Sequence, residues 1–170
     1  IRSEVSNALG KIFVRNLTTN LEEELIFSEE EVYDGGISII QKDKNTDLIH
    51  ISYSTPKTQS RVYLYNLKTK EKKLIKEQII PSGHNPDDYI VERLNCEAHD
   101  GRKIPITITR HKKTKIDGNA NLLLYGYGSY GNSISPSFSS TKLSLINRDI
   151  IWVTAHIRGG LERGMKWWKE

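Results

Sequence analysis

The chain has 170 residues, and its 25 basic and 21 acidic side chains give a net charge of +4. That length allows one ordinary domain or two small ones. Residues 1–81 balance 12 basic against 12 acidic side chains, so residues 82–170 carry the whole excess. The basic side chains there are scattered, whereas a nucleic-acid site needs a basic stripe with aromatic partners, and we therefore expect no nucleic-acid binding.

The sequence predicts a soluble, cytoplasmic protein without a membrane partner. The N-terminus lacks the basic-then-apolar pattern of a signal peptide, and no apolar run approaches the ~20 residues that span a bilayer. The single cysteine, Cys96, cannot form an internal disulfide, and its apolar neighbours predict a buried thiol. Because the first residue is Ile1 rather than Met, we expect a processed product, an engineered piece or an internal segment.

Short stretches in the first half alternate polar and apolar residues, which is the pattern of half-buried β-strands. They cover residues 11–16, 24–27, 48–54, 61–66 and 72–76. The same N-L-x-T turn recurs at residues 16–19 and 66–69. Short strands at even spacing are typical of a sandwich, a barrel or propeller blades, and the repeated turn favours blades.

The pattern changes at residues 80–88, where prolines, a glycine and polar residues form a linker. Beyond it, the expected order is a hairpin, a strand, a helix, a strand and the beginning of a helix. The corresponding ranges are 89–97 and 103–110 for the hairpin, joined at Asp100-Gly101, then 122–125, 139–148, 150–155 and 163–170. The strand 122–125 is apolar throughout, so we expect both of its faces to be covered. The last elements have the βαβ rhythm of a parallel sheet, and the predicted fold class is mixed β and α/β.

The sequence GYGSYG at residues 126–131 follows a predicted strand and matches the G-x-G-x-x-G pattern of dinucleotide-binding loops. In those proteins the helix opens at the loop, so that its N-terminus holds the pyrophosphate. Here residues 132–138, which include Pro136, intervene before any helix. The following strand leads into His156 rather than into an acidic residue that could hold a ribose. Dinucleotide binding is therefore disfavoured, and we expect no cofactor.

The same loop also fits acyl transfer. A hydrolase needs hydrogen-bond donors aimed at the developing oxyanion, and in α/β-hydrolases one donor comes from the loop after the third strand. Residues 126–131 take that position if the predicted hairpin supplies the first two strands. A tyrosine hydroxyl can replace a backbone N–H as donor. The alternative, that the tyrosines only pack, stays open on position and spacing alone.

At this loop the sequence resembles the prolyl oligopeptidase family, in particular oligopeptidase B. The matching segments are residues 123–131, 136–139, 143–145 and 155–160, with residues 99–105 similar to the family's DGTKIP hairpin. The resemblance implies the last blades of a β-propeller over residues 1–81. It further implies the N-terminal part of an α/β-hydrolase sheet over residues 82–170. The implied activity is that of a serine peptidase, gated by the propeller, that cleaves short peptides after Lys or Arg.

The resemblance also assigns candidate site residues. Tyr127 matches the tyrosine whose hydroxyl donates to the oxyanion, and Tyr130 matches an aromatic residue near the pocket for the substrate side chain. Arg158 is a candidate contact for a substrate carbonyl, with a structural ion pair as an equal alternative. The catalytic serine, aspartate and histidine would lie downstream of Glu170, so we expect the chain alone to be inactive. The expected partners are a short peptide and a complementary chain that carries this triad; the alternative is a non-catalytic module that binds a peptide or another chain.

Some residues depart from the family pattern. Leu161 stands where the family usually has a third glycine. Ser135 and Ser137 stand where oligopeptidase B members can carry acidic residues that favour basic substrates, which weakens the expectation of cleavage after Lys or Arg. His156 is expected to be structural or to orient its loop. The other histidines lack the spacing of metal ligands, so we expect no metal site.

Overall fold

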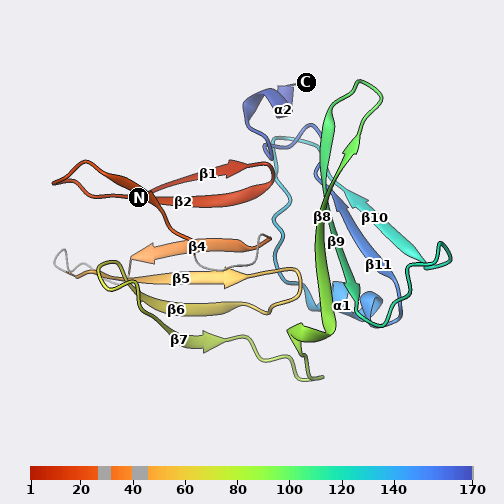
Figure 1. Cartoon of the computed structure of the whole chain (residues 1–170), viewed down its shortest axis with the longest axis horizontal. Helices are drawn as coiled ribbons and strands as arrows, with labels where there is room; N and C mark the ends of the chain where they lie inside the picture. Colours follow the sequence, from red (N-terminus) through yellow and green to blue (C-terminus); the bar gives the residue numbers. More distant parts are fainter. Residues whose placement is uncertain (27–31, 40–45, 170) are drawn as a thin grey trace.

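The computed structural model describes residues 1–26, 32–39 and 46–169. Within these residues the chain forms mostly β-strands with few helices, arranged in three sheets (Figure 1). Two sheets belong to the first half of the chain and the third belongs to the second half. This agrees with the predicted mixture of β and α/β structure. The division of the chain at residues 81 and 82 stays a prediction.

The first sheet is an antiparallel meander of β1 (Arg2–Ser6), β2 (Leu9–Arg15) and β3 (Glu22–Glu24). The sequence does not predict β1, because its side chains are exposed and show no half-buried alternation. β3 begins two residues before the predicted strand 24–27, of which Phe27 lies outside the described residues. An exposed ion pair joins the two outer strands of this sheet, because the Arg2 guanidinium lies 2.8 Å from the Glu22 carboxylate.

The second sheet contains β4 (Asp34–Ile39), β5 (Leu48–Ser54), β6 (Arg61–Asn66) and β7 (Lys72–Glu77) in sequence order, with each strand antiparallel to the next. Four strands in this order have the form of one propeller blade. The bounds of β5 and β6 are those predicted from alternation. The sequence did not predict β4, because glycines occupy its second and third positions. A Cβ on Gly36 would lie 2.7 Å from the Ser52 hydroxyl oxygen, so this strand pairs closely with β5 only without a side chain there.

The repeated N-L-x-T turn has one geometry at both of its positions. The Asn16 side chain accepts hydrogen bonds from the N–H groups of Thr18 and Thr19, at 2.9 and 3.1 Å. Asn66 accepts equivalent bonds from residues 68 and 69, also at 2.9 and 3.1 Å. Such Asx turns satisfy backbone donors locally. The echo seen in the sequence is therefore a true repeat of a strand–turn–strand unit.

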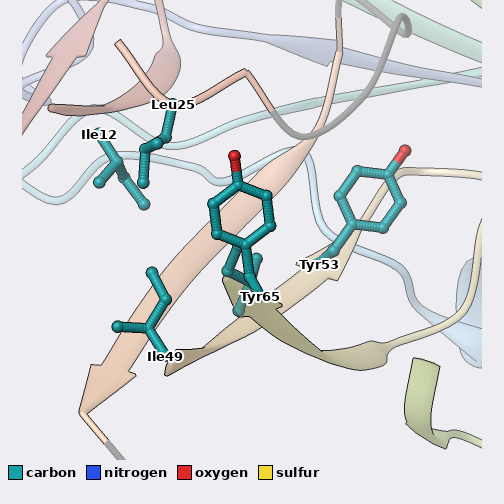
Figure 2. Packing of buried hydrophobic residues seen from close by; sticks show 6 residues of the cluster. Ile12, Leu25, Ile49, Tyr53 and Tyr65 are labelled. Carbon is teal, nitrogen blue, oxygen red and sulfur yellow. The ribbon is translucent and has the colours of Figure 1, made fainter. Parts of the chain in front are cut away.

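The core of the first half lies between its two sheets. Figure 2 shows its buried side chains, which come from both sheets: Ile12, Leu25, Ile49, Ile51, Tyr53 and Tyr65. Ile51 is 2% exposed and Leu25 is 3% exposed. Burial of each such side chain stabilises the fold by roughly 1.5–3 kcal/mol. The contact joins neighbouring sheets face to face, as in adjacent blades.

The third sheet combines β8 (Tyr89–Glu97), β9 (Lys103–His111), β10 (Leu122–Gly126) and β11 (Ile151–Ala155), in the order β10-β11-β9-β8. A single 3-10 turn, η1 (Pro86–Asp88), precedes it. β8 and β9 are antiparallel and meet at the predicted turn, where Gly101 has a φ of +78°. β10 and β11 pair in parallel, with α1 (Ser140–Ile146) as the crossover helix. The prediction of a parallel pair is confirmed.

Two predictions about burial are wrong, and both concern the outer strands of the third sheet. β10 and β8 are the outer strands of the third sheet, so each has an open edge. Leu122 and Leu124 are 56% and 64% exposed, although the sequence predicted that both faces of this strand would be covered. Cys96 lies in the exposed second half of β8 and is a free, exposed thiol.

The second half of the chain also contains two short helices. α1 buries Leu143 and Ile146 beside Tyr89 and Trp152. α2 (Met165–Lys169) buries Trp167, which is 3% exposed. None of the helices in the described ranges is long and apolar enough to cross a membrane.

Candidate active-site loops

The parallel strands β10 and β11 bring two loops to one end of the third sheet, where the carboxyl ends of both strands lie. The last paired residues are Gly126 and Ala155, and residues 127–139 and 156–164 follow them. Ligands of α/β sheets bind beyond the carboxyl ends of parallel strands. All three predicted site residues lie in these loops, so the structure brings their segments together.

The two loops touch through glycines. A Cβ on Gly128 would lie 2.0 Å from the Arg158 carbonyl oxygen, and a Cβ on Gly159 would lie 1.9 Å from the Gly128 carbonyl oxygen. Gly159 also has a φ of +93°, which favours glycine. The Gly131 N–H donates a hydrogen bond of 2.9 Å to the Gly159 carbonyl. This pair of loops, which we call the glycine lock, fixes the backbone on both sides of Tyr127.

Tyr127 is the first residue beyond β10, and its side chain is 39% exposed. Within the described residues its hydroxyl makes no hydrogen bond. Tyr130 lies at the tip of the loop, with a φ of +57° and 86% of its surface exposed. The two rings are therefore held by one loop but stand in different surroundings. Their roles in catalysis and substrate binding stay predictions.

Arg158 forms an ion pair with Asp100, at 2.5 Å between Nη1 and Oδ2. Desolvation by itself would raise the pKa of Asp100, but hydrogen bonds from the Arg102 N–H and the Arg158 guanidinium hold that pKa below its usual range. The ion pair ties the β8–β9 turn to the loop after β11. The structural ion pair foreseen for Arg158 is thus present, and its contact with a substrate stays a prediction.

His156 is fully buried directly after β11. Its Nε2 lies 2.8 Å from the Thr107 hydroxyl oxygen and 3.2 Å from the Arg93 guanidinium, which can only donate, so Nε2 accepts. Burial, together with the smaller effects of the Arg93 and Lys142 charges, lowers the pKa of His156 to about 4. The ring is therefore neutral at pH 7, and its contacts with Thr107 and Arg93 agree with the structural role that the sequence predicts.

Ser135 and Ser137 line a small cavity together with Lys142, His156 and threonines of β9 and β11. Its volume is about 10 Å³, so at most one water-sized group fits. Burial lowers the pKa of Lys142, whose Nζ lies 5.3 Å from the centre of the Trp152 ring. The described lining residues include no carboxylate, and the charge beside these two serines is positive.

Sequence reasoning missed two residues that organise these loops. Glu162 is fully buried and accepts a hydrogen bond from the Ile134 N–H at 3.0 Å. Arg93 links β8 to Thr107 and His156. Glu162 is buried and Arg93 is partly buried, and both make their contacts with residues that are distant in sequence. Only the pairing of distant segments reveals them.

Known proteins with similar sequences identify the family to which this arrangement belongs. No family model matches the chain. The chain is 36% identical over 169 residues to dipeptidyl aminopeptidase BI of Pseudoxanthomonas mexicana, a match that covers 99% of this chain and 23% of that protein. It is 30% identical over 142 residues to protease 2 of Moraxella lacunata, which covers 84% of this chain and 20% of that protein. The chain thus spans about a fifth to a quarter of the length of these curated relatives.

Solved structures of peptidases also match this chain over nearly its whole length. The closed form of oligopeptidase B from Trypanosoma brucei, with covalently bound antipain, matches with a TM-score of 0.87 and 30% identity over 98% of this chain and 24% of that chain. Oligopeptidase B from Leishmania major matches with a TM-score of 0.85 and 25% identity over the same shares. A blade-like antiparallel sheet followed by a mixed sheet with a βαβ unit is thus the architecture of a segment of these peptidases. The chain belongs to the prolyl oligopeptidase family, close to oligopeptidase B.

Proposed function

We propose that this chain is the segment of a serine oligopeptidase that supplies an oxyanion donor, the Tyr127 hydroxyl. One observation carries the proposal: the glycine lock holds Tyr127 at the carboxyl end of the parallel pair, with its hydroxyl unpaired among the described residues. As a peptide carbonyl is attacked, its oxygen gains negative charge, and a hydroxyl fixed nearby then donates a stronger hydrogen bond. Such a donor lowers the barrier because it binds the transition state better than the substrate.

The catalytic triad is proposed to come from chain beyond residues 1–170 or from a complementary chain. The open edge of β10 supports this proposal. Leu122 and Leu124 are exposed there, and apolar residues on an unpaired strand are a surface for further pairing. A strand added at this edge would continue an α/β-hydrolase sheet and bring its own loop beside residues 126–131. A non-catalytic module that binds another chain at the same edge is the alternative.

The proposed substrates are short peptides, cleaved after Lys or Arg. Relatives of this chain include oligopeptidase B as well as a dipeptidyl aminopeptidase and prolyl endopeptidases. Ser135 and Ser137 carry no charge and share their cavity with Lys142. The carboxylate that would bind a basic substrate side chain therefore has to come from another part of the peptidase.

The experiment compares fluorogenic peptides that carry Arg, Pro or Ala before the cleaved bond, in the peptidase that contains this segment. We expect the highest kcat/KM with Arg, and a fluorophosphonate label on a serine outside residues 1–170. A preference for Pro or Ala would overturn the proposed specificity while leaving the peptidase assignment intact. An assembly that binds peptides but takes up no label would instead support the non-catalytic alternative.

A further inference from the structure

The turn between β1 and β2 has one exposed residue, Asn7, and one buried residue, Ala8, although it is the tip of a hairpin. Asn7 and Ala8 have φ values of 52° and 63°, as in a two-residue hairpin turn with both central residues in the left-handed region. Connections of this kind generally lie on the surface, yet Ala8 is only 4% exposed. In Figure 1 this end of the hairpin points toward β8 and the segment that leads to α2. Another part of the chain therefore covers Ala8.

Two residues of the second half hold the tip through its backbone. The Ala8 N–H donates a hydrogen bond of 2.7 Å to the Glu162 carbonyl. The Arg93 guanidinium donates from Nη2 to the Asn7 carbonyl, and from Nη1 it donates to the Thr107 hydroxyl at 2.7 Å. The tip is therefore clamped between β8 and the loop that follows β11. Hydrogen bonds from a charged donor are the stronger kind, so the Arg93 contact is a substantial part of this clamp.

Glu162 extends the contact toward the candidate site. Its side chain accepts from the Ile134 N–H at 3.0 Å, which ties the loop after β11 to the loop after β10. The carboxylate fits because residue 160 is a glycine: a Cβ there would lie 2.0 Å from Glu162 Oε2. A buried carboxylate is costly unless its environment is organised around it. Within the described residues Oε1 has the Ile134 N–H as its donor, whereas the buried Oε2 has no hydrogen-bond partner, so the contact with Ile134 is what fixes the carboxylate.

The same loop contains one half of the glycine lock. Gly159 lies three residues before Glu162, and it contacts Gly128, the residue after Tyr127. A continuous set of backbone contacts thus runs from the hairpin tip through residues 159–162 to the Tyr127 loop. Displacement of the tip would release the Glu162 carbonyl, and the loop that carries this residue also supports Tyr127.

We propose that Ala8, Arg93 and Glu162 form a latch that couples the β1–β2 hairpin of the first half to the position of the Tyr127 loop. These are positioning residues, because none of them reaches the reacting atoms. The consequence for catalysis rests on the proposed function, whereas the coupling itself does not. The latch makes the loop geometry depend on docking of the first half.

Amide hydrogen exchange in the 170-residue chain tests the coupling. Ala8→Pro removes the donor to Glu162 and cannot adopt the positive φ, whereas Ala8→Gly keeps both and serves as the matched control. We expect Ala8→Pro to speed exchange at the Ile134 and Gly131 amides by about tenfold, the effect of losing one such constraint. Ala8→Gly should leave both rates near wild type, and amides of β5 should stay protected in both variants.

A second variant keeps the test decisive if proline prevents folding. Arg93→Met removes the donor to Asn7 without changing any backbone, and it should speed exchange at the same two amides. Two results would overturn the latch. One is wild-type exchange at Ile134 and Gly131 in the variants that fold, and the other is equal acceleration throughout the chain, β5 included, which would mean a merely structural contact.

An activity measurement in the full peptidase separates the latch from the proposed function. We expect Arg93→Met to lower kcat about tenfold with little change in KM, because a displaced oxyanion donor affects the transition state more than the substrate. Arg93→Lys, which keeps the charge and one donor, should recover part of this loss. If Tyr127→Phe leaves kcat unchanged while the exchange result holds, the proposed function fails and the latch stands. If kcat depends on Tyr127 but Arg93→Met leaves it unchanged, the latch has no catalytic role and the proposal is wrong.

Discussion

Gly159 lies against Gly128 so closely that a Cβ on Gly159 would be 1.9 Å from the Gly128 carbonyl oxygen. No side chain fits at that distance, so the contact can form only between these two glycine backbones. Through it, the loop after β11 fixes the residue that follows Tyr127. The geometry of the candidate site is thus set by a backbone contact rather than by packing of its own side chains.

Gly159→Ala should damage both stability and activity. The new methyl group would clash with backbone and would sit at a φ of +93°. We expect a loss of about 3 kcal/mol in the free energy of unfolding, measured by urea denaturation. Gly118→Ala is the matched control, because Gly118 has a φ of +84° but open space around it. Its cost should be the backbone strain alone, about 1 kcal/mol. Equal losses in the two variants would contradict the glycine lock.

Tyr127→Phe should slow turnover in the peptidase without unfolding it. Loss of one oxyanion donor costs roughly 3 kcal/mol of transition-state stabilisation, or on the order of a hundredfold in kcat. KM and Tm should hardly change, because the ring remains. Tyr125→Phe, two residues earlier on β10, is the control for loss of a tyrosine hydroxyl in the same segment. Unchanged kcat in Tyr127→Phe, or a fall in Tm with kcat preserved, would make Tyr127 a packing residue.

The isolated 170-residue chain should have no peptidase activity. Nucleophilic catalysis needs a serine with a base in reach, and His156 is buried, accepts at Nε2 and is neutral at pH 7. Incubation with a fluorophosphonate probe and a peptide that carries Arg before the cleaved bond is the measurement. Covalent labelling of any serine in the chain would show this expectation to be wrong.

Acid should destabilise the fold through His156. Its pKa is about 4 in the folded chain against 6.5 for the free side chain, so the unfolded state binds more protons between these values. The stability contributed by the neutral ring is fully present above pH 6.5 and is lost as the pH falls toward 4. The loss is on the order of 3 kcal/mol. Between pH 7 and pH 4 the Tm should fall less steeply with pH in His156→Gln than in wild type. His99 is exposed, so His99→Gln should keep the wild-type dependence of Tm on pH.

The sequence by itself determined the elements whose signals are local. Alternation of polar and apolar residues predicted β5 and β6 to the residue, and the Asp100-Gly101 turn predicted the β8–β9 hairpin. The N-L-x-T turns are equally local, because each asparagine bonds N–H groups two and three residues away. The glycine-rich loop could also be recognised, because the backbone contact requires glycines and these form a pattern in the sequence.

Tertiary structure alone decided what each element would face. Leu124 and Cys96 are apolar or small, yet both lie exposed on the outer strands β10 and β8, where no described segment covers them. Ala8 and Glu162 look like ordinary turn and loop residues, yet both are buried because a hairpin tip docks on a loop more than 150 positions away in the chain. Burial depends on which segments become neighbours, and that pairing is set by contacts across the whole chain. Local periodicity carries no information about it.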